Sequence, residues 1–154
     1  MPPSVEKLSQ NYFNHKREFN ELAKRVLEDQ QKGLERIDNT WTRPNDLTKI
    51  GLTYEDISNY RKAFEKLSIP RGFYAFPEKV IFIAHTSGLS ISGTSMGYTY
   101  SIKTPTNYFK ENCGYSTEPL KHLDDYKGCS GYAKSYTIHQ KIDDNWYIYE
   151  EFED

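Results

Sequence analysis

The stretch from Thr86 to Gly97 contains a pattern that is typical of an enzyme. Its residues Gly93-Thr94-Ser95-Met96-Gly97 match G-x-S-x-G, the nucleophile motif of serine hydrolases. Asp124 and His139 follow in the chain order of a Ser-Asp-His triad. In hydrolases a helix must follow the serine, whereas Tyr98 and the residues after it are typical of a strand. We therefore expect a tight hairpin or bulge here, and a small serine hydrolase using Ser95 remains an alternative.

Metal and cofactor chemistry has little support in the sequence. No histidine pair shows H-x-x-H or H-x-x-x-H spacing, and no C-x-x-C is present. His122 with Asp124 and Asp125 is at most a weak cation cluster. The Ser/Gly stretch lacks the Gly-Lys-Ser/Thr ending of a phosphate-binding P-loop. We predict no metal, no cofactor and no catalytic residue.

Tyrosine is the more informative residue type, with 13 in the chain. Six of them fall at spacings of two or four on predicted strands, so one face of the sheet is a candidate tyrosine surface. Tyrosine is enriched in protein interfaces and stacks on sugars; the alternative is that helices cover this face. The predicted binding residues are Ser90, Ser92, Ser95, Tyr98, Tyr100, Tyr132, Tyr136, Tyr147 and Tyr149.

The first third of the chain has helical periodicity. Apolar residues recur at spacings of three and four across residues 5–32, which predicts one long amphipathic helix with Ser4 as N-cap and Gly33 as its end. Residues 34–42 are predicted to be extended, with Trp41 as an anchor against the domain. A second helix is expected over about 54–67, because Thr53 and Asp56 form a capping-box pattern.

Beyond Pro70 the period changes to two. Strands are predicted over about 80–84, 89–92, 97–102, 132–142 and 146–152, the last two joined by a turn at Asp143-Asp144-Asn145. Residues 103–131 are expected to be irregular. The fold class is α+β: a long N-terminal helix and a second helix packed on an antiparallel sheet of four to five strands. The chain is expected to form a single domain over 1–154, with 1–4 and 153–154 frayed.

The charge balance argues against nucleic acid as a partner, because the formal net charge is −2 and no basic cluster is evident. The last twelve residues carry six carboxylates and no Lys or Arg. We expect a solvated acidic end, with a surface for a basic partner as the alternative. No apolar run approaches the length of a membrane span, so anchoring would need a lipidated N-terminus that was removed.

Two cysteines bear on the compartment. Cys113 and Cys129 lie in Gly-, Ser- and Tyr-rich sequence typical of turns. A disulfide between them would close a short loop and stabilise the fold by about 3 kcal/mol. We expect this bridge, and with it an oxidising compartment; two free thiols in a reducing cytoplasm are the alternative.

Two motifs resemble a known group of proteins. They are the run from Ile81 to Ser101, with its Ser87-Gly-Leu-Ser-Ile-Ser-Gly-Thr-Ser-Met-Gly97 core, and Asp144-Asn-Trp-Tyr-Ile-Tyr-Glu150. Together they resemble small uncharacterised lipoproteins of proteobacterial cell envelopes. The resemblance implies a periplasmic or envelope-anchored protein and implies no activity. A cytoplasmic location is the alternative.

These observations favour a non-enzymatic binding protein of the cell envelope whose partner is another protein. One concrete version is an immunity or inhibitor protein that blocks a secreted toxin or hydrolase. A carbohydrate-binding module that stacks sugars on tyrosine is a further alternative.

Overall fold

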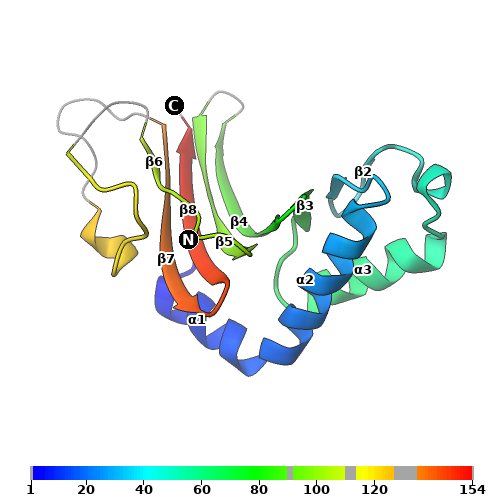
Figure 1. Cartoon of the computed structure of the whole chain (residues 1–154), viewed down its shortest axis with the longest axis horizontal. Coiled ribbons are helices and arrows are strands. Elements are labelled where there is room, and N and C mark those ends of the chain that lie inside the picture. Colours follow the sequence, from blue (N-terminus) through cyan, green and yellow to red (C-terminus); the bar gives the residue numbers. More distant parts are fainter. Residues whose placement is uncertain (1, 90–91, 110–113, 127–134, 154) are drawn as a thin grey trace.

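The computed structural model describes residues 2–89, 92–109, 114–126 and 135–153 (Figure 1). Ser90, Cys113, Cys129 and Tyr132 therefore lie outside the described residues, as does the side chain of Ser92. The helices are α1 (Val5–Asn14), α2 (Lys16–Gln30) and α3 (Tyr54–Lys66), with short 3-10 turns η1 (Leu47–Ile50) and η2 (Leu123–Asp125). None of the described helices is long and apolar enough to cross a lipid bilayer.

The eight described strands form one antiparallel sheet in the order β2-β1-β3-β4-β5-β8-β7-β6. They are β1 (Arg36–Ile37), β2 (Thr42–Arg43), β3 (Phe73–Phe76), β4 (Lys79–Leu89), β5 (Ser92–Ser101), β6 (Tyr108–Phe109), β7 (Tyr136–Asp143) and β8 (Trp146–Glu153). The α+β class with an antiparallel sheet is confirmed, but the prediction of four to five strands is wrong. Three of the strands have only two residues, too few for alternation to show in a sequence.

The predicted single helix over 5–32 is two helices. His15 adopts a non-helical backbone between them (φ −129°, ψ 28°). The break lets both helices follow the twisted sheet: Tyr12 of α1 and Phe19 of α2 both pack on Trp146 of β8, with ring centroids 5.1 and 5.6 Å apart. The predicted cap at Ser4 is confirmed, because its hydroxyl accepts a hydrogen bond from the Lys7 amide.

The second predicted helix and its capping box are confirmed. Thr53 and Asp56 exchange side-chain and backbone hydrogen bonds at the start of α3. Tyr60 and Phe64 of this helix pack on Phe73 of β3. All three α-helices therefore cover one face of the sheet, the helix-covered face.

The opposite face carries the alternate residues of each strand, because successive side chains in a strand point to opposite sides. At β7 and β8 it is covered by the connection from β5 to β6, where Asn107 contacts His139. At β1 and β3 large aromatic side chains remain exposed. The opposite face is thus closed at one end of the sheet and open at the other.

Candidate binding surface

The predicted tyrosines do not share one face. The register pairs Tyr98 with Ile148 and Tyr100 with Trp146, so these tyrosines face the helices, whereas Tyr147 and Tyr149 project from the opposite face. The expectation of a single tyrosine surface is therefore wrong. A one-residue difference in strand register decides the face, and spacing within each strand cannot reveal it.

Tyr98 is a core residue. It is fully buried, its hydroxyl donates to the Leu8 carbonyl at 2.7 Å, and it accepts from Asn11 Nδ2 at 3.1 Å. Burial raises the pKa of Tyr98 to about 12. Tyr98 lies beneath α1 and is not accessible to a binding partner.

Tyr100 and Tyr136 are half-buried at the margins of the helix-covered face. Tyr100 packs edge-on against Trp146, with centroids 5.2 Å apart. Tyr136 stacks on Phe152 and donates to Glu150 at 3.2 Å. Both side chains therefore already have partners within the domain.

Ser95 and Tyr149 are brought together on the opposite face, with their oxygens 2.9 Å apart. Tyr149 and Tyr147 are each only 3% exposed. Burial raises the pKa of Tyr149 well above its usual range, so this phenol stays protonated and offers Ser95 no base. The pair is a part-buried polar contact between neighbouring strands.

A catalytic triad around Ser95 is not assembled. Ser95 pairs with Glu151 in register, while His139 lies on β7, beyond β8, and contacts Asn107 instead. The Ser/Gly stretch forms the expected hairpin: residues 86–89 and 92–95 are paired parts of β4 and β5. Its glycines allow close approach, since a Cβ on Gly97 would lie 1.9 Å from the Phe82 carbonyl oxygen.

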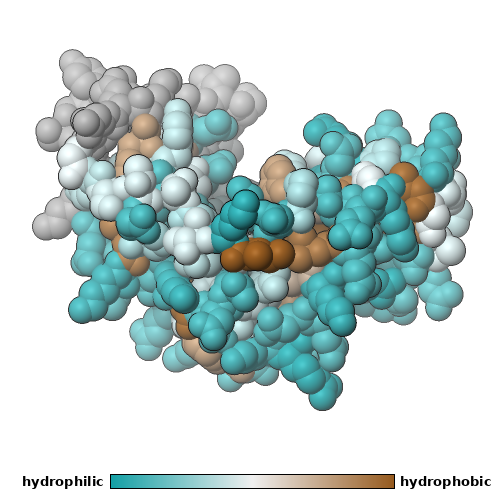
Figure 2. Space-filling model, in the orientation of Figure 1, coloured by the Kyte–Doolittle hydropathy of each residue, from teal (hydrophilic) through white to brown (hydrophobic). Residues whose placement is uncertain are grey.

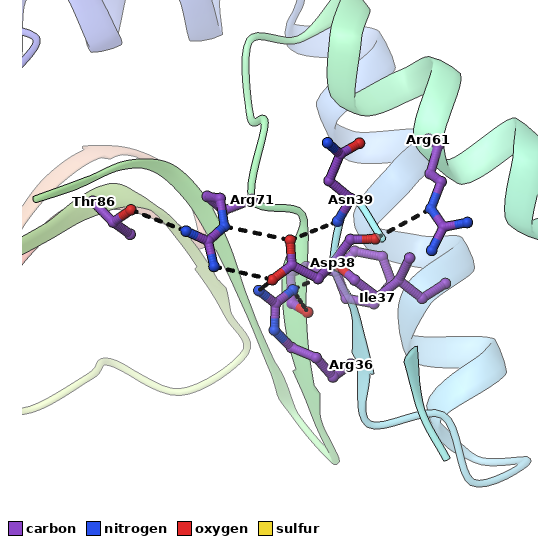
Figure 3. A network of polar contacts seen from close by, with 8 residues as sticks. Arg36, Ile37, Asp38, Asn39, Arg61, Arg71 and Thr86 are labelled. Atoms are coloured by element: carbon purple, nitrogen blue, oxygen red, sulfur yellow. Dashed lines mark hydrogen bonds and ion pairs between the residues drawn. The ribbon is translucent and has the colours of Figure 1, made fainter. Parts of the chain in front are cut away.

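A network centred on Asp38 lies where the opposite face is open (Figure 3). Arg36 donates from Nη2 to Asp38 Oδ2 at 3.0 Å and from Nη1 to the carbonyls of Ile37 and Phe73. Arg71 reaches the same carboxylate from the other side, at 3.2 and 3.4 Å. Arg61 of α3 donates to the Asp38 carbonyl.

Two arginines thus share one buried carboxylate. Arg36 and Asp38 are each 2% exposed, whereas half of the Arg71 side chain is exposed. Burial alone would raise the pKa of Asp38, but hydrogen bonds from Arg71 and the Asn39 amide, with the charge of Arg36, hold it below its usual value. The cluster therefore carries an excess positive charge at its accessible end.

Exposed aromatic rings surround this network, each paired with a cation. The Arg36 guanidinium lies 4.4 Å from the Tyr74 ring centroid and 5.2 Å from that of Trp41. Arg43 lies over Trp41 at 5.8 Å, and Lys79 over Phe76 at 5.1 Å. We call this set the Trp41 surface; its members are Arg36, Trp41, Arg43, Tyr74, Phe76 and Lys79.

The rings of the Trp41 surface are partly exposed. Trp41 is 41% exposed, Tyr74 39% and Phe76 40%. The expectation that Trp41 anchors against the body of the domain is therefore only half met. The cations hold these rings in place and leave their remaining area to solvent.

A groove adjoins Trp41 on its other side, between the β1–β2 turn and α3. Its volume is about 880 Å³, within the range of ligand-binding clefts. It is lined by amide and hydroxyl side chains, three aromatic rings and the cations Arg61 and Lys62. Among the lining residues are Asn39, Thr40, Asn45, Tyr54 and Ser58.

The sequence carried only a faint signal for this surface. Trp41 stands between Arg36 and Arg43, a residue combination typical of protein interfaces. Tyr74, Phe76 and Arg71 come from a segment that has no sequence feature of its own. Sheet pairing brings them together, since Arg36 pairs with both Arg43 and Tyr74.

No metal centre emerges in the ranges that the structure describes: no three His, Cys, Asp or Glu side chains lie together as ligands there, the cluster at His122 included. Comparison with protein-family models, with curated proteins and with solved structures finds no match to this chain. The function is therefore inferred from the geometry.

Proposed function

We propose that this chain is a non-enzymatic binding protein of the bacterial cell envelope and that it binds another protein through the Trp41 surface. The observation that carries the proposal is the exposure of Trp41, Tyr74 and Phe76 on one side of the sheet, each paired with a cation. Tryptophan, tyrosine and arginine are the residues that dominate binding energy at protein interfaces.

Rigidity supports this choice of surface. Arg36 is fixed by two backbone carbonyls and by Asp38, and it holds Trp41 and Tyr74 in turn. A side chain that is already ordered loses little conformational entropy when a partner binds. The Trp41 surface is therefore prepared for binding before the partner arrives.

Charge indicates an acidic partner. Arg43 is exposed and Arg71 half-exposed, and Lys79 lies over Phe76 on the same face. The nearby Asp38 is buried and already compensated by Arg36. Complementary charge around an aromatic centre speeds association and suppresses wrong partners.

An immunity or inhibitor protein fits these features, since such a protein needs a rigid surface and no chemistry of its own. The envelope location rests on the sequence resemblance and on the expected bridge between Cys113 and Cys129. Intact mass measured with and without reductant tests the bridge. Two free thiols in protein isolated without reductant would favour a cytoplasmic location.

Affinity capture from envelope extract tests the binding role, with the captured protein identified and its affinity then measured on purified components. Trp41→Ala should remove the partner. Phe13→Ala is the matched control, because Phe13 is an exposed aromatic on α1, away from the Trp41 surface. Equal binding by both variants would contradict the proposal.

A further inference from the structure

Strand β4 has a free edge along its second half. Within β4, β3 pairs only with Lys79–Phe82, and the last backbone hydrogen bond on that side among the described residues runs from the Ile83 amide to the Gly72 carbonyl at 2.9 Å. From Ala84 to Leu89, β4 pairs with β5 alone within the described residues. Figure 1 shows this part of β4 at the margin of the sheet, and Figure 2 shows the molecular outline indented beside it.

This edge has only part of the usual protection. Natural edge strands are kept short or carry charged residues and proline that prevent pairing with another chain. The outermost strands β2 and β6 follow that rule with two residues each. Ala84–Leu89 is six residues long, the length of an average strand, and contains no charged residue and no proline. A bulge between Ile83 and His85 separates it from the part that β3 covers.

The position of Arg71 indicates that a partner at this edge would carry a negative charge. Its Nη1 lies 3.4 Å from Thr86 Oγ1 on this edge, and its other nitrogens share Asp38 with Arg36. These contacts are long for charge-assisted hydrogen bonds, which are normally 2.7–2.9 Å. The guanidinium is half-exposed and only partly compensated. A carboxylate arriving along the edge would complete its coordination.

We propose that the partner inserts an extended acidic segment beside Ala84–Leu89, adding a strand to the sheet, and that Arg71 binds a carboxylate of that segment. Main-chain hydrogen bonds to the free edge supply affinity, and alternate side chains of the added strand supply specificity. This inference rests on the proposed binding function, for which it specifies the form of the partner. The added strand would continue the line of β3 along the same edge of β4, because β3 already occupies the edge at Lys79–Phe82.

A blocked hexapeptide of alternating glutamate and valine is the probe. Titrated into isotopically labelled protein, it should shift the backbone amide signals of Ala84–Leu89 and slow their hydrogen exchange. Two control peptides are N-methylated at alternate residues, one at the odd and one at the even positions. The one whose methyl groups block the amides facing β4 should not bind, whereas the other should bind like the unmodified peptide. A lysine–valine peptide should bind more weakly than the glutamate peptide.

Arg71→Glu should weaken the glutamate peptide at least about tenfold, the loss expected of one charge-assisted contact. Lys62→Glu is the matched control, since Lys62 is an exposed cation on α3 and no hydrogen bond or ion pair joins it to β4 among the described residues. If Arg71→Glu fails to fold, the N-methylated peptides still decide the question on the unaltered protein.

Three results would overturn strand addition: no binding at millimolar peptide, equal binding of both N-methylated forms, or amide shifts confined to other elements. Dimerisation through the β4 edge would also contradict it, and sedimentation of the protein alone would show this. A partner that is lost on Trp41→Ala but unaffected by Arg71→Glu would leave the proposed function standing and remove strand addition.

Discussion

The two faces of the sheet are built from similar residue types used in different ways. On the helix-covered face, Phe19, Phe82, Tyr98 and Trp146 pack ring against ring and are all fully buried. On the opposite face, Trp41 and Tyr74 pack against a guanidinium and keep about 40% of their area exposed. Aromatic rings form the core on one face, whereas on the other an ionic network holds partly exposed rings in place.

The contrast between the two tryptophans should be the largest effect. Trp146→Ala removes the centre of the aromatic core and the Nε1 hydrogen bond to Asn20, and should lower the free energy of unfolding by about 4 kcal/mol. Trp41→Ala should lower the free energy of unfolding by less than about 1 kcal/mol, because 41% of the Trp41 side chain is already exposed to solvent. Urea denaturation of both variants measures the difference. Similar losses would show that Trp41 is a structural residue.

Breaking the Asp38 network should have the next largest effect. Asp38→Ala leaves Arg36 buried without its counter-charge and should destabilise the protein by about 3 kcal/mol. The double variant Arg36→Met with Asp38→Leu should be more stable than Asp38→Ala alone, since no unpaired charge remains. Denaturation midpoints and slopes for the set test this. A double variant less stable than the single one would mean that Arg36 acts mainly through its carbonyl contacts.

The pH dependence of stability should include a contribution from His139, which is buried at the closed end of the opposite face. Burial lowers the pKa of His139 to about 4, against 6.5 for an ordinary histidine, so protons bind the unfolded chain first. Stability should fall as pH drops from about 6.5 to about 4, by roughly 2–3 kcal/mol. His139→Gln should flatten the unfolding free energy over that window. Unchanged curvature in the variant would assign the titration to other groups.

The sequence was informative wherever structure is local. The caps at Ser4 and Thr53 and the hairpin between β7 and β8 follow from residues three or four apart, and all three are found. The face taken by each tyrosine, the break at His15 and the site around Asp38 depend on pairing between distant strands. Arg36, Arg71 and Thr86 meet only because β1, β3 and β4 are neighbours, which no spacing in the chain encodes.

Substitution of Glu150 should change the free energy of unfolding least. Burial raises the pKa of Glu150, which accepts a hydrogen bond from Tyr136, so the charged form is disfavoured in the folded protein. A raised carboxyl pKa destabilises the fold above that pKa, and the penalty vanishes as pH falls below the unfolded value. Glu150→Gln should therefore stabilise slightly at pH 7 and not at pH 4. A loss at pH 7 would mean that the carboxylate has a cation partner.

Hydrogen exchange with and without the captured partner tests the central claim most directly, because it reports both faces at once. We predict slower exchange in residues 36–43 and 71–76, which carry Arg71 and all of the Trp41 surface except Lys79, and in the β4 edge at 84–89. Exchange in α1 and α2 should be unchanged. Protection confined to the helices or to the acidic strand β8 would contradict the assignment of binding to the open end of the opposite face.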